Sequence, residues 1–430
     1  MRRWPAVLAA LLVVAAVDAA VVVQRSGGTG SPATAPSTAH GEATRAATSA
    51  AAAAVDDVLA RRAAAVTHRD LAAFVALLDP DAPAFVAEQQ AQFQAMSQLP
   101  LTDVTYRADA ASAAARGPVA RYGAVPTYAP TVTFSYEIAG FDDEPVTATE
   151  VDTFVDRGGR WLLAADTDFG PPSPKIWQYG PIAVVRGTHS LVVAAASGVP
   201  AARAVAAEVD RDVPAVSAVW GAGWSQRVVV LMPPTQADLA ALIGTSGDLS
   251  QIAAAESAEL THEQQAGARI LINPLPYASL SPVGRQVVIT HELTHVASRT
   301  VTTPSTPLWL VEGFADYVGF RSTDLSAPVV AAELVARLRA GFVPAALPDD
   351  AAFGPGAPNL DVQYQLAWLA CRLIAARIGT AGLVAFYRDV GGSGAQPAAA
   401  VDDTLRELLH EDTAQFTRDW VAYVDRELPR

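Results

Sequence analysis

The sequence predicts an α+β protein with two folded domains, and three observations lead to this fold class. At 430 residues, the chain is longer than one hydrophobic core usually supports. A helical pattern fills about residues 50–96, whereas β-branched and aromatic residues alternate with polar ones in Thr131–Ala139 and Ala148–Asp156. From Ser281 onward, helical patterns dominate again. We therefore expect a helix-plus-antiparallel-sheet domain, followed by a mostly helical domain with a small sheet.

Residues 1–25 have the pattern of a secretory signal peptide or a single membrane anchor. Arg2 and Arg3 precede an apolar stretch, Trp4–Val23, that is long enough to cross a bilayer. Asp18 lies inside this stretch, and a charge near the centre of a membrane span costs about 3 kcal/mol. The sequence does not distinguish a segment that is cleaved off from one that is retained as an anchor. Either outcome places the rest of the chain outside the cytoplasm, membrane-anchored or secreted.

The charge balance argues against one class of partner. The chain has 44 acidic and 30 basic residues, a formal net charge of -14, whereas nucleic-acid binding requires clustered Lys and Arg. We therefore expect no nucleic-acid partner.

The single cysteine, Cys371, cannot form an internal disulfide, and its apolar helical surroundings predict a buried, small hydrophobic residue.

Composition and turn signals divide the N-terminal half. Residues 26–49 are rich in Gly, Ser, Thr, Ala and Pro without apolar periodicity, which predicts a disordered linker. Prolines interrupt the following helical sequence at Asp79–Pro83, and Arg157–Arg160 separates two strand patterns as a hairpin turn does. Helices followed by a curved antiparallel sheet over residues 50–169 resemble the cone-shaped fold of the nuclear-transport-factor-2-like (NTF2-like) and SnoaL-like families. The resemblance implies an accessory domain.

The proline-rich segment Gly170–Pro174 predicts the boundary to a second domain, about residues 178–430. Within it, the apolar run Val228–Met232 predicts a buried strand. The alternating, proline-terminated segment Ala268–Asn273 predicts an edge strand, and the polar segment Asp248–Gln265 before it has a helical pattern.

A His-Glu-x-x-His (HExxH) motif lies in a helical pattern and carries the chemistry. His291 and His295 are four residues apart, so both imidazoles lie on one helical face and can bind one cation. Glu292 is turned about 100° from His291, so it can reach a metal-bound water without displacing a ligand. Zinc lowers the pKa of its water to about 7, and a neighbouring carboxylate takes the proton as the water attacks a carbonyl. The motif predicts a zinc hydrolase with Glu292 as catalytic base.

The next predicted helix supplies a third metal ligand. Glu312 and Asp316 lie one turn apart on one face, and Gly313 removes a side chain where two helices must approach. Glu312 can therefore bind the metal, while Asp316 can accept the outer N–H of a ligating imidazole and fix its tautomer. We expect one Zn²⁺ per chain, although imidazole and carboxylate also hold other divalent ions.

These motifs resemble those of the gluzincin metallopeptidases (clan MA, peptidase MA-like). In that family, the His-Glu-x-x-His helix precedes a helix with a Glu ligand in a Trp-x-x-Glu-Gly-x-Ala-Asp-Tyr-like stretch, which matches His291–His295 and Trp309–Tyr317. A metzincin would need glycine and histidine where Ser298 and Val301 stand. The resemblance implies a gluzincin-like fold over residues 178–430 and hydrolysis of peptide bonds.

The resemblance also implies roles for residues outside the two motifs. Tyr364, near the start of a later helix, matches a tyrosine that supports the oxyanion, although a tyrosine in an apolar helix is as readily part of the core. Ala268–Asn273 occupies the place of the edge strand along which substrates lie. The aminopeptidase branch carries an upstream Gly-x-Met-Glu-Asn element whose acid holds the substrate amine. Gly267–Leu271 offers no such acid, so we do not expect an aminopeptidase.

Two other functions stay open. One is a non-catalytic envelope-binding protein with a structural or vestigial metal site. The presence of Glu292 argues against it, because a structural zinc has no need of that carboxylate and is usually closed by a fourth protein ligand. The other is a zinc hydrolase of a non-peptide amide, which the sequence does not distinguish from a peptidase.

Overall fold

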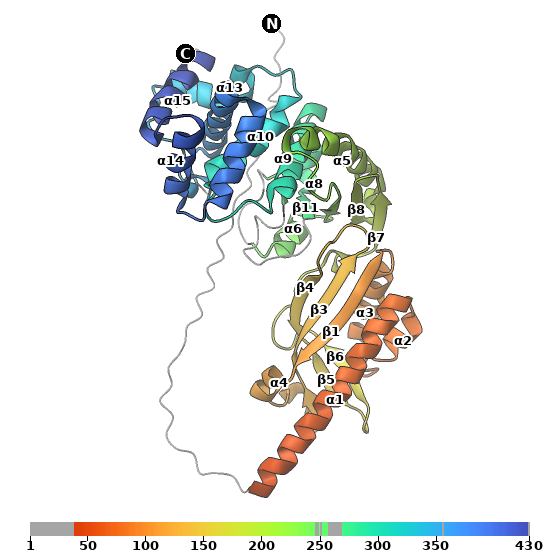
Figure 1. Ribbon diagram of the computed structural model, residues 1–430. Coiled ribbons are helices and arrows are strands. Elements are labelled where there is room, and N and C mark those ends of the chain that lie inside the picture. The colour runs from red at the N-terminus through yellow and green to blue at the C-terminus, as the bar shows by residue number, and fades with distance from the viewer. Residues whose placement is uncertain (1–37, 246–248, 250–251, 257–268, 355–356, 429–430) are drawn as a thin grey trace. The chain divides into compact units, whose positions relative to one another are not determined.

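The computed structural model describes residues 38–245, 249, 252–256, 269–354 and 357–428 (Figure 1). The described chain is a mixed α+β protein, as predicted, and it divides into two compact units between Ala183 and Val184. The predicted signal or anchor segment and residues 26–37 of the predicted linker lie outside the described residues.

The N-terminal unit begins with three helices, α1 (Thr38–His68), α2 (Leu71–Val75) and α3 (Pro83–Met96). α1 starts within the segment predicted as a disordered linker. The reason is local, because the sequence from Thr38 onward is rich in alanine and contains no proline until Pro80. Pro83 occupies the first turn of α3, where a proline costs no helical hydrogen bond.

Two three-stranded sheets, ordered β1-β3-β4 and β2-β5-β6, follow the helices, and their hydrogen-bonded pairs are antiparallel. Their strands are β1 (Leu101–Asp109), β2 (Thr127–Tyr128), β3 (Thr131–Ile138), β4 (Val146–Val151), β5 (Thr153–Asp156) and β6 (Trp161–Ala165). A short helix, α4 (Ala110–Arg116), directly follows β1 in the chain. α1 packs against β1 and β6 and buries one apolar face there. The resemblance of this unit to the NTF2-like and SnoaL-like families stays a prediction.

Two buried acids of this unit have raised pKa values. Burial raises the pKa of Asp152 to about 8 and that of Asp166 to about 6, and the negative charge of Glu150 acts in the same direction on both. In the folded unit these groups therefore hold protons at pH values where the unfolded chain has released them.

We expect the free energy of unfolding of this unit to fall as pH rises. An acid whose pKa is raised by folding contributes stability that is fully present below its unfolded pKa, about 4, and is lost as pH rises through its folded pKa. For Asp152 that loss extends to about pH 8. Calorimetry of the full chain over this range measures it, and Asp152→Asn should flatten the dependence. An unfolding temperature with the same pH dependence in both proteins would contradict this expectation.

The second unit is built on a five-stranded sheet with the order β10-β11-β9-β8-β7. Its strands are β7 (Ile182–Arg186), β8 (Ser190–Ala195), β9 (Val228–Met232), β10 (Ala254–Glu256) and β11 (Arg269–Ile272). β9 coincides with the predicted buried strand. β8, β9 and β11 are parallel, and β10 runs antiparallel to β11.

Two expectations for this sheet are wrong. β11, within the predicted edge strand Ala268–Asn273, is an interior strand with all four residues buried, because β10 pairs with its outer side. β10 falls in the segment predicted to be helical. Alanine and glutamate favour helices in isolation, but pairing with β11 satisfies the backbone of Ala254–Glu256 instead. Residues 257–265 of that segment lie outside the described residues.

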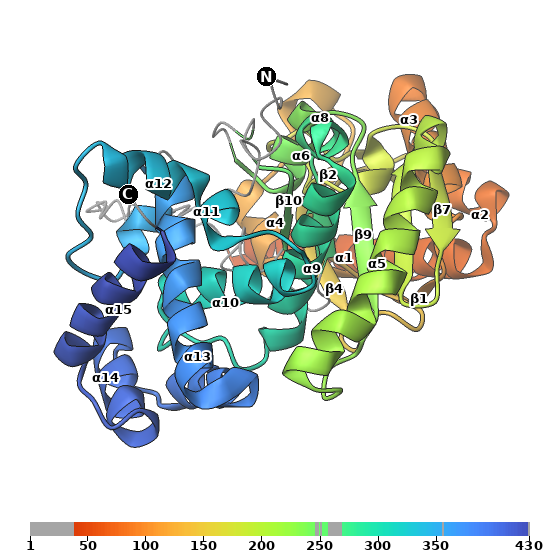
Figure 2. The same cartoon turned by 90° about the horizontal axis from the view of Figure 1, so that it is seen from above.

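Helices form the rest of this unit. They are α5 (Val199–Trp220), α6 (Gln236–Leu242), α8 (Pro274–Ser279), α9 (Pro282–Ser298), α10 (Leu308–Arg321), α11 (Ala327–Val330), α12 (Ala332–Arg339), α13 (Leu360–Gly392), α14 (Pro397–Leu408) and α15 (Thr413–Glu427). α9 packs between α5 and α10, and α10 packs against α13, as the view from above also shows (Figure 2). Most of these helices contribute apolar side chains to one core, whereas Leu239 of α6 belongs to a separate small cluster.

α13 is the one described helix that is long and apolar enough to cross a membrane. It packs against α10, α14 and α15, as the core helix of a globular unit does. Gly379 interrupts its regular geometry with a φ of 77°, so α13 consists of two helical segments joined at a kink. Cys371, in the first segment, is fully buried, as predicted.

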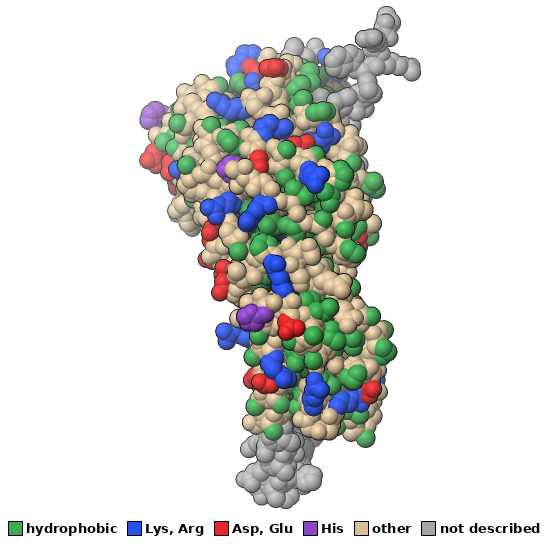
Figure 3. Space-filling view, turned by 90° about the vertical axis from the view of Figure 1, so that its right-hand side faces the viewer, with side chains coloured by type: hydrophobic (Ala, Val, Ile, Leu, Met, Phe, Trp, Pro, Cys, Tyr) green, Lys and Arg blue, Asp and Glu red, His purple; other side chains and the backbone are tan. Residues whose placement is uncertain are grey.

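On the face shown in Figure 3, basic side chains are interspersed with acidic and apolar ones. The drawn part of this face therefore presents charges of both signs.

Candidate metal centre

The motif helix α9 has clear start signals and a buried body. The Ser281 hydroxyl accepts a hydrogen bond from Gly284 N at 3.0 Å, and Pro282 occupies the first turn. All residues from Val287 to Ser298 are buried, so the motif lies in the core of the unit and not on a solvated face. Polar side chains are costly in a core unless they have partners, so the buried polar residues of the motif must have a functional or structural role.

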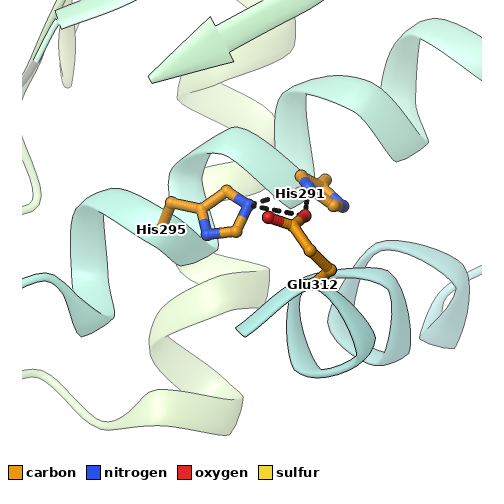
Figure 4. A group of neighbouring side chains, drawn as sticks. All are labelled: His291, His295 and Glu312. Atoms are coloured by element: carbon orange, nitrogen blue, oxygen red, sulfur yellow. Dashed lines mark hydrogen bonds and ion pairs between the residues drawn. The ribbon is translucent and has the colours of Figure 1, made fainter. Parts of the chain in front are cut away.

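Three side chains from two helices converge (Figure 4). His291 and His295 come from α9 and Glu312 from α10, and one ligand atom from each lies within 4.8 Å of the others. The Glu312 Oε2 atom is 3.3 Å from His291 Nε2 and 3.6 Å from His295 Nε2. The two Nε2 atoms are 2.8 Å apart. The structure thus brings together the three residues that the sequence predicts as metal ligands.

The donor set and its spacing fit a zinc ion. Tetrahedral zinc with bonds of about 2.0–2.1 Å places neighbouring ligand atoms about 3.3 Å apart. The two imidazole-to-carboxylate distances, 3.3 and 3.6 Å, are close to this value, and the Nε2–Nε2 distance of 2.8 Å is shorter by about half an ångström. Three protein ligands leave a fourth position open, as catalytic zinc sites require.

His291 and Glu312 act on each other's charge. Burial and the neighbouring His295 would lower the pKa of His291, but hydrogen bonds to Asp316 and Glu312 outweigh them and raise it to about 9. Burial would raise the pKa of Glu312, but the two imidazoles lower it to about 2. Glu312 is therefore an anion throughout the neutral range, and metal binding must release a proton from His291.

Asp316 is hydrogen-bonded to one of the imidazoles. Its Oδ1 atom lies 2.9 Å from His291 Nδ1, and both side chains are buried. When Nδ1–H donates to this carboxylate and the second ring proton has left, the Nε2 lone pair of His291 faces Glu312 and His295.

We expect Asp316→Asn to weaken zinc binding about 10- to 100-fold, because loss of an orienting carboxylate lowers the basicity of the imidazole and releases its tautomer. Competition with a chelating dye measures the affinity. Asp389→Asn is the matched control, since Asp389 is exposed on α13. Equal zinc affinity of Asp316→Asn and wild type would rule out the orienting role.

The two residues predicted to act on substrate are also buried in this region. Glu292 follows His291 on α9, the helix that packs against the edge strand β10. Tyr364 lies in the first turns of α13, with its ring 6.5 Å from the His291 ring and 5.4 Å from the Phe353 ring. The structure therefore places Tyr364 beside the ligand group. Its role in catalysis stays a prediction.

Close helix packing determines where Glu312 lies. A Cβ atom added to Gly313 would lie 2.4 Å from the Ala367 carbonyl oxygen of α13, and one added to Gly319 would lie 3.1 Å from the Val287 carbonyl oxygen of α9. α10 thus uses one glycine toward each neighbouring helix. The first of these contacts follows the sequence expectation for Gly313.

A second tyrosine near the site was not predicted. Tyr387, on α13, is fully buried, packs its ring against Phe314 at 5.0 Å and lies 2.7 Å from the Thr302 hydroxyl in the loop between α9 and α10. The same loop donates from Thr303 Oγ1 to the Gly391 carbonyl at 2.7 Å. These contacts hold the loop that separates the histidines from Glu312. In the sequence, the only indication of these loop contacts is a tyrosine, which has a polar hydroxyl, within an otherwise apolar helix.

Comparisons with known proteins give partial similarity. The sequence matches no protein-family model and no curated protein. Among solved structures, the chain is similar to an M1 zinc metallopeptidase from Deinococcus radiodurans, with 17% identity and a TM-score of 0.33 over 62% of this chain and 58% of that one. It is also similar to yeast LTA4 hydrolase, with 11% identity and a TM-score of 0.38 over 69% of this chain and 65% of that one. The chain thus spans less than two thirds of the length of these enzymes, and TM-scores at this level do not establish a common fold.

Proposed function

We propose that this chain is a zinc-dependent peptidase. The observation that carries the proposal is the convergence of His291, His295 and Glu312, buried and within 4.8 Å of one another, on a helix pair that also bears Glu292. A buried set of two imidazoles and one carboxylate is the ligand type of catalytic zinc, and it leaves one coordination position for water or substrate.

Each polar group then has a chemical role. Zinc, when bound, supplies a Lewis acid and lowers the pKa of a water ligand to about 7. Glu292 accepts the proton of the attacking water and later delivers it to the leaving amine nitrogen. Tyr364 donates a hydrogen bond to the oxygen that gains negative charge. Asp316 keeps His291 in the tautomer that binds metal.

The first experiment is zinc analysis of the purified protein together with an assay on an unbiased peptide library. We expect about one zinc per chain, chelator-sensitive cleavage, and weakened zinc binding in Glu312→Ala because one of three ligands is lost. A wild-type protein that folds without binding zinc would exclude the proposal.

The binding-protein alternative makes a different prediction for the same samples. A structural or vestigial site would hold zinc, but neither the wild type nor any variant would cleave a peptide or another amide. Cleavage of simple amides without cleavage of peptides would favour the hydrolase of non-peptide amides.

The expectation against an aminopeptidase has lost its structural basis. It rested on the absence of an acid from Gly267–Leu271. β11 is an interior strand, however, and β10, which forms the edge of the sheet beside it, ends in an acid, Glu256. We therefore include recognition of a free amino terminus among the properties to be measured. A cleavage assay on pairs of peptides with free and acetylated N-termini tests this recognition, since an aminopeptidase cleaves only the free form.

We further propose that the peptidase acts outside the cytoplasm, from the basic and apolar pattern of residues 1–25. Fractionation of cells that express the full chain tests this location. Recovery of the intact chain from the cytosol alone would contradict it.

A further inference from the structure

The N-terminal unit contains a buried arginine without an ion pair. Arg62, on α1, is only 7% exposed. Its Nη2 atom donates to Gln89 Oε1 at 2.5 Å, whereas Nε and Nη1 make no hydrogen bond. Among the described residues, no carboxylate oxygen lies within ion-pair distance of this guanidinium. A buried cation with unpartnered donors is strongly unfavourable by itself, so an anionic partner would stabilise it.

The groups around Arg62 compensate its charge only in part. The guanidinium lies over the Phe74 ring, 4.2 Å from its centroid, and 5.4 Å from that of Tyr106. Burial raises the pKa of Tyr106 to about 12, so this phenol stays neutral. Gln89, whose Oε1 accepts from Arg62 Nη2, is also neutral, and its Nε2 donates to Asp166 Oδ2 at 3.2 Å. Asp152 also acts on the Arg62 charge through space, but the direct neighbours of the guanidinium are ring faces and an amide, so its charge is compensated only in part.

Arg62 lines a cavity in the same unit. The cavity has a volume of about 20 Å³, which exceeds the roughly 10–15 Å³ that a single water requires. Apolar and aromatic side chains of Phe134, Leu163 and Trp177 line one part of it. It therefore has room for slightly more than one water-sized group, such as the oxygen end of a carboxylate.

The remaining charged groups of the cavity are two acids and one ion pair. Lys175 Nζ and Glu150 Oε2 pair at 2.7 Å, so their charges cancel. Asp152 and Asp166 also line the cavity, and burial raises the pKa of both. In their protonated form these carboxyl groups can donate a hydrogen bond to an anion.

We propose that this cavity binds a small monocarboxylate, or the carboxylate end of a longer molecule, with Arg62 as its principal partner. A carboxylate is planar, singly charged and accepts several hydrogen bonds, as the free guanidinium N–H groups require. A tetrahedral dianion is larger, and its second charge would meet stronger repulsion from the ionised forms of Asp152 and Asp166. The site belongs to the N-terminal unit and does not depend on the proposed metal centre.

Binding should be tighter at low pH. The titratable and charged groups that face the bound carboxylate are Arg62, Lys175, Tyr106, Glu150, Asp152 and Asp166. Of these, the two aspartates gain protons as pH falls, which removes repulsion and adds donors. The affinity should therefore decrease as pH rises through about 6 and about 8.

Calorimetric titration of the full chain with formate, against chloride at equal ionic strength, tests the proposal. We expect formate to bind and chloride to bind at least tenfold more weakly. Arg62→Met, which keeps the length of the side chain and removes its donors, should weaken formate binding at least tenfold. Arg61→Met is the matched control, because Arg61 is the neighbouring residue, 54% exposed in its side chain and paired with Asp57.

Three outcomes would overturn the proposal: no formate binding, equal binding of chloride, or unchanged binding by a folded Arg62→Met protein. Should Arg62→Met not fold, Asp152→Asn provides the second test. That variant keeps Arg62 and cannot ionise at position 152, so formate binding should lose most of its dependence on pH above about 6. An unchanged pH dependence in this variant would count against the site.

Discussion

Glu292→Gln is expected to lower kcat/KM by about 10²- to 10⁴-fold while zinc content stays unchanged, because the amide cannot accept the proton of the attacking water. The side chain keeps its size and burial, so α9 and its two histidines should remain in place. Steady-state kinetics on a library-derived peptide, together with zinc analysis of the same sample, measure both quantities.

The matched control for this variant is Glu407→Gln, which alters an exposed glutamate on α14 and should leave kcat/KM unchanged. Wild-type turnover by a zinc-loaded Glu292→Gln protein would show that another group is the base. Loss of zinc in this variant would show that Glu292 supports the metal site, and the assigned division of roles would be wrong.

Gly313→Ala should produce the largest structural effect of any single methyl group near the site. The new Cβ would lie 2.4 Å from the Ala367 carbonyl oxygen and 3.1 Å from Cys371 Sγ, so α10 and α13 must separate. Overpacking of this kind typically costs about 1–3 kcal/mol, and here it should also displace the adjacent candidate ligand, Glu312. We expect a lower unfolding temperature and weaker zinc binding.

Alanine substitutions at two other glycines serve as comparisons for Gly313→Ala. Gly392→Ala, on α13, meets no atom within 4 Å and should leave stability equal or slightly higher. Gly319→Ala, with a contact of 3.1 Å to the Val287 carbonyl oxygen, should have an intermediate effect. A Gly313→Ala protein with wild-type unfolding temperature and zinc affinity would show that the helices separate without cost.

The candidate ligand set follows from the sequence because the helix itself determines the geometry. A spacing of four residues places His291 and His295 on one face in any α-helix, and a spacing of four places Asp316 one turn from Glu312. The glycine beside Glu312 likewise signals a close helix contact before any neighbour is known. Local rules of this kind need no knowledge of the rest of the chain.

The position of the sheet edge was decided by the tertiary structure. The pattern of Ala268–Asn273 shows that a strand forms, but a pattern does not state how many neighbours a strand has. β10 has a sequence of good helix-forming residues and becomes a strand only because β11 offers unpaired backbone groups. The same nonlocal pairing reopened the question of aminopeptidase activity.

The sequence by itself determined the α+β class, the two-helix motif and the residues able to hold a metal, since these depend on local periodicity and spacing. Only the tertiary structure decided which strand forms the sheet edge, that Tyr387 contacts the loop between α9 and α10, and that Arg62 is buried without an ion pair. The physical reason is that burial and pairing depend on segments far apart in the chain, whereas spacing along one helix depends on the helix alone.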